Sequence, residues 1–193
     1  MRAGLTVSPM SSISALWGAW VIVWMIAAAW TSRTVEHQPV GPRLAHAVLF
    51  FGGSLLLFFR PDALGPGIRL APAAAWGGAV LVAVGLGFAV WARVHLGRMW
   101  SGHVTLKADH AIIRTGPYGW VRHPIYTGLL LAATGTAIVQ GTPGSLVGLV
   151  VLTLGILLKI RQEEQLLRGH FGDEYRAYQR EVPALVPRFR GGT

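Results

Sequence analysis

Five long apolar runs decide what this chain can fold into. They cover residues 12–31, 44–59, 72–94, 125–139 and 145–158, and charged side chains are almost absent from them. A helix of about 20 apolar residues crosses the hydrocarbon core of a bilayer. The runs therefore predict an all-α protein, a multi-pass transmembrane helix bundle with about five membrane helices.

The lengths of the runs leave two points open. The run at 12–31 is long enough to cross a bilayer, and a signal peptide is the weaker alternative because Arg2 makes a poor basic leader. The last two runs have about 15 residues each, or about 22 Å of helix. They either cross the membrane or form a hairpin that stops partway, joined by the tight turn QGTPG.

Composition agrees with a one-domain membrane protein. Of the 193 residues, 52% are hydrophobic and 13% are charged, whereas soluble domains carry about 25% charged residues. The lack of cysteine excludes disulfides, thiolate metal sites and a cysteine nucleophile. The net charge of +9 lies beside the apolar runs, which indicates contact with a membrane surface rather than with nucleic acid.

Two polar stretches, residues 93–122 and residues 159–193, flank the last two runs. Lys and Arg are frequent in both and absent from the turn between the runs. By the positive-inside tendency, both stretches face the cytoplasm and the N-terminus lies outside. We therefore expect the two stretches to share one face of the membrane and to build one site.

The first polar stretch is rich in histidine, which raises the question of a metal. It holds His95, His103 and His110, with Asp109 as its one carboxylate, and His123 follows it directly. Their spacing does not place a ligand pair on one helix face. We predict no metal site.

The segment GPYGWVRHPIYTG, residues 116–128, places two basic side chains at the start of the fourth run. Pro124 suits the first turn of a helix because its φ is fixed and it has no N–H to leave unpaired. Arg122 and His123 then stand at a helix start, where exposed N–H groups favour a negatively charged ligand. The alternative is a basic anchor at the membrane interface.

Adjacent Glu163 and Glu164 lie at the end of the fifth run. Arg168 could pair with Glu164 one turn later, but two carboxylates beside hydrocarbon indicate a site. Beyond them, apolar residues at helical spacing predict a pair of amphipathic helices with a break at Gly172-Asp173. The apolar positions are Leu166, Leu167, Phe171, Tyr175, Tyr178 and Val182.

Small residues predict where helices pack closely. On the third run they recur every four residues and form a smooth ridge. Gly128, Ala132 and Thr136 mark a similar face on the fourth run, as do Gly144 and Gly148 on the fifth. The ridge on the third run consists of Ala75, Ala79, Ala83 and Gly87.

The motifs LGRMWSG, GPYGWVRHPIYTG and EEQLL, followed by HFGDEYRAYQREVPALVP, stand in this order over residues 96–189. Together they resemble the isoprenylcysteine carboxyl methyltransferase family of membrane methyltransferases, which is related to phospholipid N-methyltransferases. The resemblance implies S-adenosylmethionine as cofactor, held by the loop before the fourth run and the C-terminal segment. The matching positions are Gly116, Pro117, Tyr118, Arg122, His123, Pro124, Tyr126, Gly128, Glu163 and Glu164.

The chemistry of the cofactor suggests roles for these residues. Arg122 and His123 suit its carboxylate, and Glu163 or Glu164 suits its ammonium or ribose hydroxyls. Tyr118 and Trp120 are either candidates for stacking on adenine or aromatic residues of the membrane interface. We take Arg122, Glu163 and Glu164 as the catalytic group, which acts by positioning because methyl transfer chiefly demands in-line orientation.

The sequence thus predicts a substrate-side half, residues 1–94, and a cofactor-binding catalytic half, residues 95–193. We expect a methyltransferase acting on a lipophilic substrate, a carboxylate of an isoprenoid-like or lipid molecule, in a bacterial inner membrane. The bacterial origin is inferred from an arginine-, alanine- and glycine-rich composition. The alternatives are an NADPH-dependent membrane reductase of the sterol-reductase type and a non-catalytic lipid-binding membrane protein.

Overall fold

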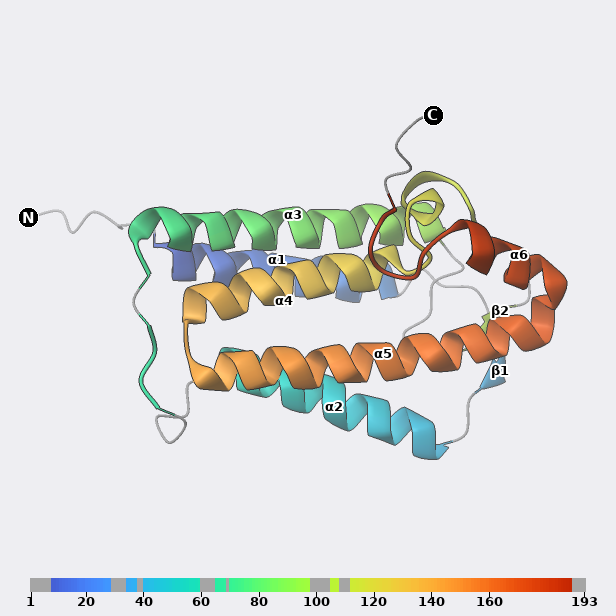
Figure 1. Ribbon diagram of the computed structural model, residues 1–193, viewed down its shortest axis with the longest axis horizontal. Coiled ribbons are helices and arrows are strands. Elements are labelled where there is room, and N and C mark those ends of the chain that lie inside the picture. Colours follow the sequence, from blue (N-terminus) through green and yellow to red (C-terminus); the bar gives the residue numbers. More distant parts are fainter. Residues whose placement is uncertain are drawn as a thin grey trace, which may run out of the picture.

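Five long helices build the protein, which confirms the predicted all-α membrane bundle (Figure 1). This computed structural model describes residues 8–28, 34–37, 40–59, 65–68, 70–97, 105–107 and 112–188. Most of the LGRMWSG motif, His103, Asp109, His110 and the end of the first run lie outside the described residues. The long helices are α1 (Pro9–Ala28), α2 (Val40–Phe58), α3 (Pro72–Leu96), α4 (Pro124–Gln140) and α5 (Pro143–Phe171).

The helices pack in two groups. In Figure 1, α1 and α4 lie beside α3, and α2 runs along α5 on the other side of the bundle. Each group has its own apolar core, and Tyr126 packs against both cores. The indole nitrogen of Trp17 on α1 donates to Thr136 Oγ1 on α4 at 3.0 Å, which fixes α1 to the first group.

A small β-ribbon is the one addition to the helical plan in the described chain. Strand β1 (Thr34–His37) pairs antiparallel with β2 (Thr105–Lys107). It ties the segment after α1 to the segment after α3. Strands of four and three residues are too short to leave an alternating pattern in the sequence.

Within the described residues, three helices are long and apolar enough to cross a membrane: α1, α3 and α5. The apolar part of α2, Leu44–Phe58, and α4 are shorter. Large apolar side chains are exposed on the outer faces of the bundle, which is typical of a surface that meets lipid. They include Phe51, Leu55, Val80, Val84, Val150 and Leu154.

Helix α5 differs from its prediction. The expected short span and the separate amphipathic helix after it are one continuous helix of 29 residues, about 43 Å long. Lys, Arg, Gln and Glu are good helix formers, so the polar residues after Leu158 end the apolar run without ending the helix. The break predicted at Gly172 is present: Gly172 has a φ of 54°, and the short helix α6 (Asp173–Glu181) follows.

Helices α3 and α4 approach at glycines. A Cβ on Gly85 would lie 2.5 Å from the Gly128 carbonyl oxygen, and one on Gly78 would lie 3.0 Å from that of Gly135. The predicted face of α4 is therefore the packed one. The predicted ridge on α3 is wrong, because Ala83 and Gly87 are exposed. The contact face lies further round the helix, at Gly78, Val82, Gly85 and Ala89.

Helices α2 and α5 meet in the same way. A Cβ on Gly148 would lie 2.8 Å from the Gly53 carbonyl oxygen, so both residues must be small. The start of α5 is capped by Thr142 and Ser145, each of which accepts a hydrogen bond from the backbone N–H of the other. Gly141, with a φ of 59°, ends α4 just before this cap.

Candidate functional site

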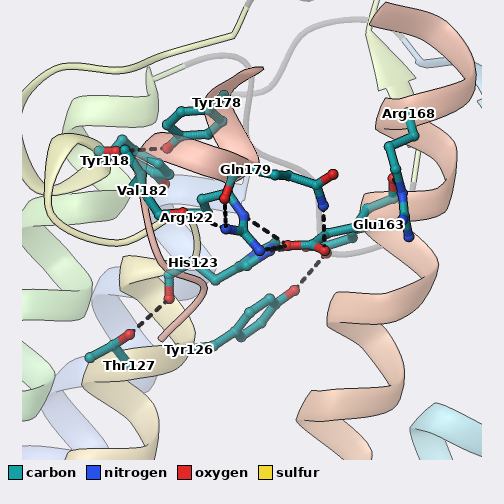
Figure 2. A network of polar contacts seen from close by, with 11 residues as sticks. Tyr118, Arg122, His123, Tyr126, Thr127, Glu163, Arg168, Tyr178, Gln179 and Val182 are labelled. Carbon is teal, nitrogen blue, oxygen red and sulfur yellow. Dashed lines mark hydrogen bonds and ion pairs between the residues drawn. The ribbon is translucent and has the colours of Figure 1, made fainter. Parts of the chain in front are cut away.

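The two polar stretches meet at one end of the bundle, as predicted. The 3₁₀ turn η3 (Gly116–Gly119) leads into α4, and this start of α4 lies against the C-terminal part of α5. Helix α6 and the segment 182–185 complete the arrangement. Figure 2 shows the polar side chains that come together there. We call Arg122, His123, Tyr126, Glu163, Glu164 and Gln179 the carboxylate cluster.

Arg122 is held on several sides. Its Nε and Nη2 donate to Glu164 Oε1 at 2.9 Å and 2.6 Å. Its Nη1 donates to the main-chain oxygen of Gln179 at 3.2 Å and to that of Val182. Both side chains of the ion pair are nearly buried, with about a tenth of their surface exposed. Arg122 thus ties the start of α4 to α5 and to the end of α6.

His123 lies between the two glutamates. Its Nε2 is 3.1 Å from Glu164 Oε1, and its Nδ1 is 3.6 Å from Glu163 Oε2. Burial alone would lower the pKa of the imidazole, but the hydrogen bonds and charges of both glutamates outweigh burial and raise it. The protonated ring is therefore favoured between the two carboxylates.

Glu163 and Glu164 have different surroundings. Glu164 Oε1 accepts from Arg122, and its Oε2 accepts from the Gln179 amide at 2.7 Å. Glu163 Oε1 accepts from the Tyr126 hydroxyl at 2.6 Å. In Figure 2, Tyr126 reaches from the start of α4 across to Glu163 on α5. Glu164 is enclosed by protein groups, whereas Glu163 has fewer donors among the described residues.

The two basic residues just before α4 are held by the C-terminal segment. The N–H of Arg122 donates to the Pro183 oxygen at 2.8 Å, and the N–H of His123 donates to the Ala184 oxygen at 3.0 Å. Thr127 Oγ1 donates to the Leu185 oxygen at 2.8 Å. The segment 182–185 therefore fixes the chain at the start of α4 through main-chain carbonyls.

Helix α6 is fastened to the turn before α4. The Tyr178 hydroxyl donates to the Tyr118 carbonyl oxygen at 2.7 Å. Arg114 lies over the Tyr178 ring, 5.4 Å from its centroid, and donates to the Glu174 main-chain oxygen at 3.0 Å. Burial raises the pKa of the Tyr178 phenol to about 12, although Arg122 and Arg114 act in the other direction. The phenol therefore stays a donor across the physiological range.

The predicted residues divide into two sets. Arg122, His123, Tyr126, Glu163 and Glu164 are in direct contact with one another. Pro117, Pro124 and Gly128 are buried parts of the backbone that shape the approach, and Gly116 has a φ of 57°. Tyr118 is buried beneath α6, where it is stacked on His95.

Two side chains for which the sequence left alternatives open lie away from the polar groups of the cluster. The Trp120 ring is exposed and packs on Phe88 and Trp91 of α3, outside the cluster. Arg168 donates to the main-chain oxygen of Glu164 at 3.1 Å, within its own helix, and the Glu164 carboxylate is held by other residues. Each of these positions is decided by tertiary packing, which the local sequence does not specify.

The sequence analysis also missed some participants. Gln179 donates to Glu164, and the carbonyls of the segment 182–185 hold the start of α4. Lys159 lies buried one turn before Glu163, with its Nζ 5.9 Å from the centroid of the Tyr126 ring. Of these participants, only Lys159 could have been noticed in the sequence, because its charge lies at the edge of an apolar run.

The donor set of the cluster fits the groups of S-adenosylmethionine. The Glu163 carboxylate, which has fewer protein donors, suits its ammonium or ribose hydroxyls, and His123 supplies positive charge for its carboxylate. The aromatic face of Tyr126 suits a sulfonium, because cations are attracted to aromatic rings. The residues present therefore match the cofactor implied by the sequence resemblance.

The fold is a multi-pass helical bundle, and a cluster of carboxylate, arginine and histidine side chains lies at one end of it. These features are those of a membrane protein with a polar site at the ends of its helices. Residues 78–169 match the model of the isoprenylcysteine carboxyl methyltransferase (ICMT) family. This segment contains α4, the start of that helix and both glutamates. This match confirms, over these residues, the resemblance predicted from the sequence.

Named relatives methylate different acceptors. The chain is 35% identical over 99 residues to a protein-S-isoprenylcysteine O-methyltransferase of Schizosaccharomyces pombe, covering 50% of this chain and 42% of the relative. It is 41% identical over 70 residues to methanethiol S-methyltransferase 1 of Bradyrhizobium diazoefficiens, covering 36% of this chain and 24% of the relative. The chain thus spans less than half the length of either protein.

A solved structure shares the fold. The eukaryotic intramembrane Ras methyltransferase ICMT superposes with a TM-score of 0.59 at 21% sequence identity. The match covers 98% of this chain and 71% of that protein. The helical arrangement of Figure 1, including the segment before residue 78, is therefore that of a known membrane fold.

Proposed function

We propose that this protein is a membrane-embedded, S-adenosylmethionine-dependent methyltransferase that acts on a lipophilic acceptor, a carboxylate of an isoprenoid-like or lipid molecule. The observation that carries the proposal is the carboxylate cluster, which lies within or beside the segment that matches the family. The active site faces the cytoplasm of a bacterial inner membrane in this proposal. The excess of Lys and Arg at this end of the bundle supports that orientation.

The residues of the cluster take different tasks. Arg122, Glu164 and Gln179 hold α4, α5 and α6 together, because most of their polar atoms bond to one another or to main-chain oxygens. Glu163 and Tyr126 have fewer protein partners, so they are the groups that we assign to the ammonium or ribose of the cofactor. His123 supplies positive charge between the two carboxylates.

The bound cofactor would supply an electrophilic methyl group on a positively charged sulfur. The chain's own residues would orient the acceptor and exclude water, and such positioning supplies several kcal/mol without a dedicated base. A carboxylate acceptor is already ionised at neutral pH, and it needs no proton removed. The described site thus suffices for a carboxylate.

The nature of the acceptor can be tested by methyl transfer. The purified protein in liposomes would receive methyl-labelled S-adenosylmethionine with either farnesylthioacetic acid or a short alkanethiol. We expect label in the farnesyl ester and little in the thioether. Label only in the thioether would overturn the carboxylate assignment, and label in neither product would overturn the acceptor class.

The orientation needs a separate experiment. Single cysteines introduced at exposed positions 174 and 143 lie at opposite ends of the bundle. In intact cells, we expect a membrane-impermeant thiol reagent to label position 143 and to spare position 174. The reverse labelling would contradict the charge-based orientation.

A further inference from the structure

Lys159 is a buried cation in an otherwise apolar part of α5. The residue is 6% exposed, and the neighbouring Ile156 and Ile160 belong to the apolar core shared by α2, α4 and α5. A lysine at such a depth is costly, and it is retained where it pairs with another charge or serves a ligand. The cofactor groups assigned above do not need it.

Lys159 lies at the boundary between the carboxylate cluster and an apolar core. Glu163 lies one helical turn further along α5, and the two side chains interact electrostatically. The Lys159 Nζ lies 5.9 Å from the Tyr126 ring centroid, and the hydroxyl of that ring donates to Glu163. On one side of Lys159 is the carboxylate cluster, and on the other is the apolar core formed by Leu57, Ala133, Ala137, Leu152, Ile156 and Ile160.

The buried Arg93 and the nearly buried Arg122 have protein partners elsewhere. Arg93 donates to the main-chain oxygens of Gly97 and Ala27, which join the ends of α3 and α1. Arg122 bonds to Glu164 and to carbonyls near the end of α6. Lys159 is the basic side chain that lies beside Glu163 and Tyr126 on the side of the apolar core.

We propose that Lys159 is a specificity-determining residue that receives the negatively charged head group of an amphiphilic methyl acceptor. The inference rests on the proposed function and names the residue that recognises the negative charge of the proposed acceptor. The head group would meet the lysine, and a buried charge is stable only when it is paired.

The charge of the acceptor changes during the reaction. A carboxylate oxygen forms the new C–O bond while the methyl C–S bond breaks and its electron pair goes to sulfur. No proton is taken up or released, and the acceptor becomes a neutral ester. Lys159 therefore attracts the acceptor before transfer and has no ionic attraction for the product, which favours release.

Binding without cofactor tests this role. Calorimetry in lipid nanodiscs would compare farnesylthioacetic acid with its methyl ester, which has nearly the same shape and no charge. We expect the wild-type protein to bind the acid about tenfold or more tightly, as is typical for a contact with a charged group. Lys159→Met should remove this preference, and Lys159→Arg should keep most of it. Arg161→Gln, an exposed change on the same helix, is the matched control and should behave as wild type.

Two results would overturn the proposal. The first is equal affinity of the wild-type protein for acid and ester, which needs no variant. The second is a Lys159→Met protein that keeps the preference for the acid but loses thermal stability and affinity for S-adenosylhomocysteine. That result would mean that Lys159 serves only as a counter-ion of Glu163. Failure of the wild-type protein to bind S-adenosylhomocysteine would instead refute the proposed function, whatever the acid preference.

Discussion

The Glu164 carboxylate receives both the Nε and the Nη2 of Arg122, at 2.9 Å and 2.6 Å, on a single oxygen. The same oxygen lies 3.1 Å from His123 Nε2, and the other oxygen accepts from Gln179. Three segments, the start of α4, α5 and α6, are thereby joined at one carboxylate. The adjacent Glu163 has no such role, and the two glutamates should respond differently to substitution.

Glu164→Gln should destabilise the protein. The change leaves a nearly buried guanidinium without its counter-charge, and we expect a loss of about 1.5–3 kcal/mol. Thermal unfolding in detergent measures the effect. Glu174→Gln, an exposed carboxylate on α6, is the control and should change stability by less than about 0.5 kcal/mol. Equal effects of the two changes would contradict the joining role of Glu164.

Glu163→Gln should act mainly on the ligand. Tyr126 can still donate to the amide oxygen, so we expect a small change in stability. Affinity for S-adenosylhomocysteine should fall about ten- to a hundredfold, because a charge-assisted contact is lost. Calorimetry on the folded variant checks this, and an unchanged affinity would remove Glu163 from the site.

Gly128→Ala should weaken the packing of α3 on α4. The added methyl group would lie 2.8 Å from the backbone nitrogen of Ala89, and the helices must separate to admit it. Overpacking of this kind costs about 1–3 kcal/mol. Gly87→Ala adds the same atom where nothing lies within 4 Å and is the matched control. Thermal unfolding of the two variants should differ clearly, and similar melting temperatures would argue against the close approach.

The pH dependence of stability should carry the signature of His123. Its folded-state pKa is raised above the ordinary value of 6.5, so the folded protein holds the proton more tightly than the unfolded chain. This contribution is fully present below about pH 6.5 and is lost as the pH rises through the folded pKa. The melting temperature of the ligand-free protein should therefore fall on going from about pH 6 to pH 9, and His123→Asn should flatten that slope. An equally steep slope in the variant would refute the assignment.

The charge-free runs were sufficient to predict where the long helices lie, because an apolar stretch of this length has few other folded forms. They did not predict which face of α3 packs. A helix that is apolar all round has no polar side to orient it, so the ridge containing Ala83 was as plausible as the one containing Gly85. Only the partner helix distinguishes them.

The site was partly predictable for a similar reason. Arg122, His123 and the two glutamates stood out because charge beside an apolar run is unusual. The contacts of the segment 182–185 with the start of α4 did not stand out in the sequence, because every residue type has a main-chain carbonyl. Gln179 was equally hidden, because an amide on a polar helix face is ordinary until its partner is known.

Cofactor choice tests the central claim most directly. Wild-type protein in detergent would be titrated by calorimetry with S-adenosylhomocysteine and, in parallel, with NADPH. We predict saturable binding of S-adenosylhomocysteine that Glu163→Gln weakens, and no binding of NADPH. Saturable binding of NADPH without binding of S-adenosylhomocysteine would contradict the methyltransferase and favour a membrane reductase.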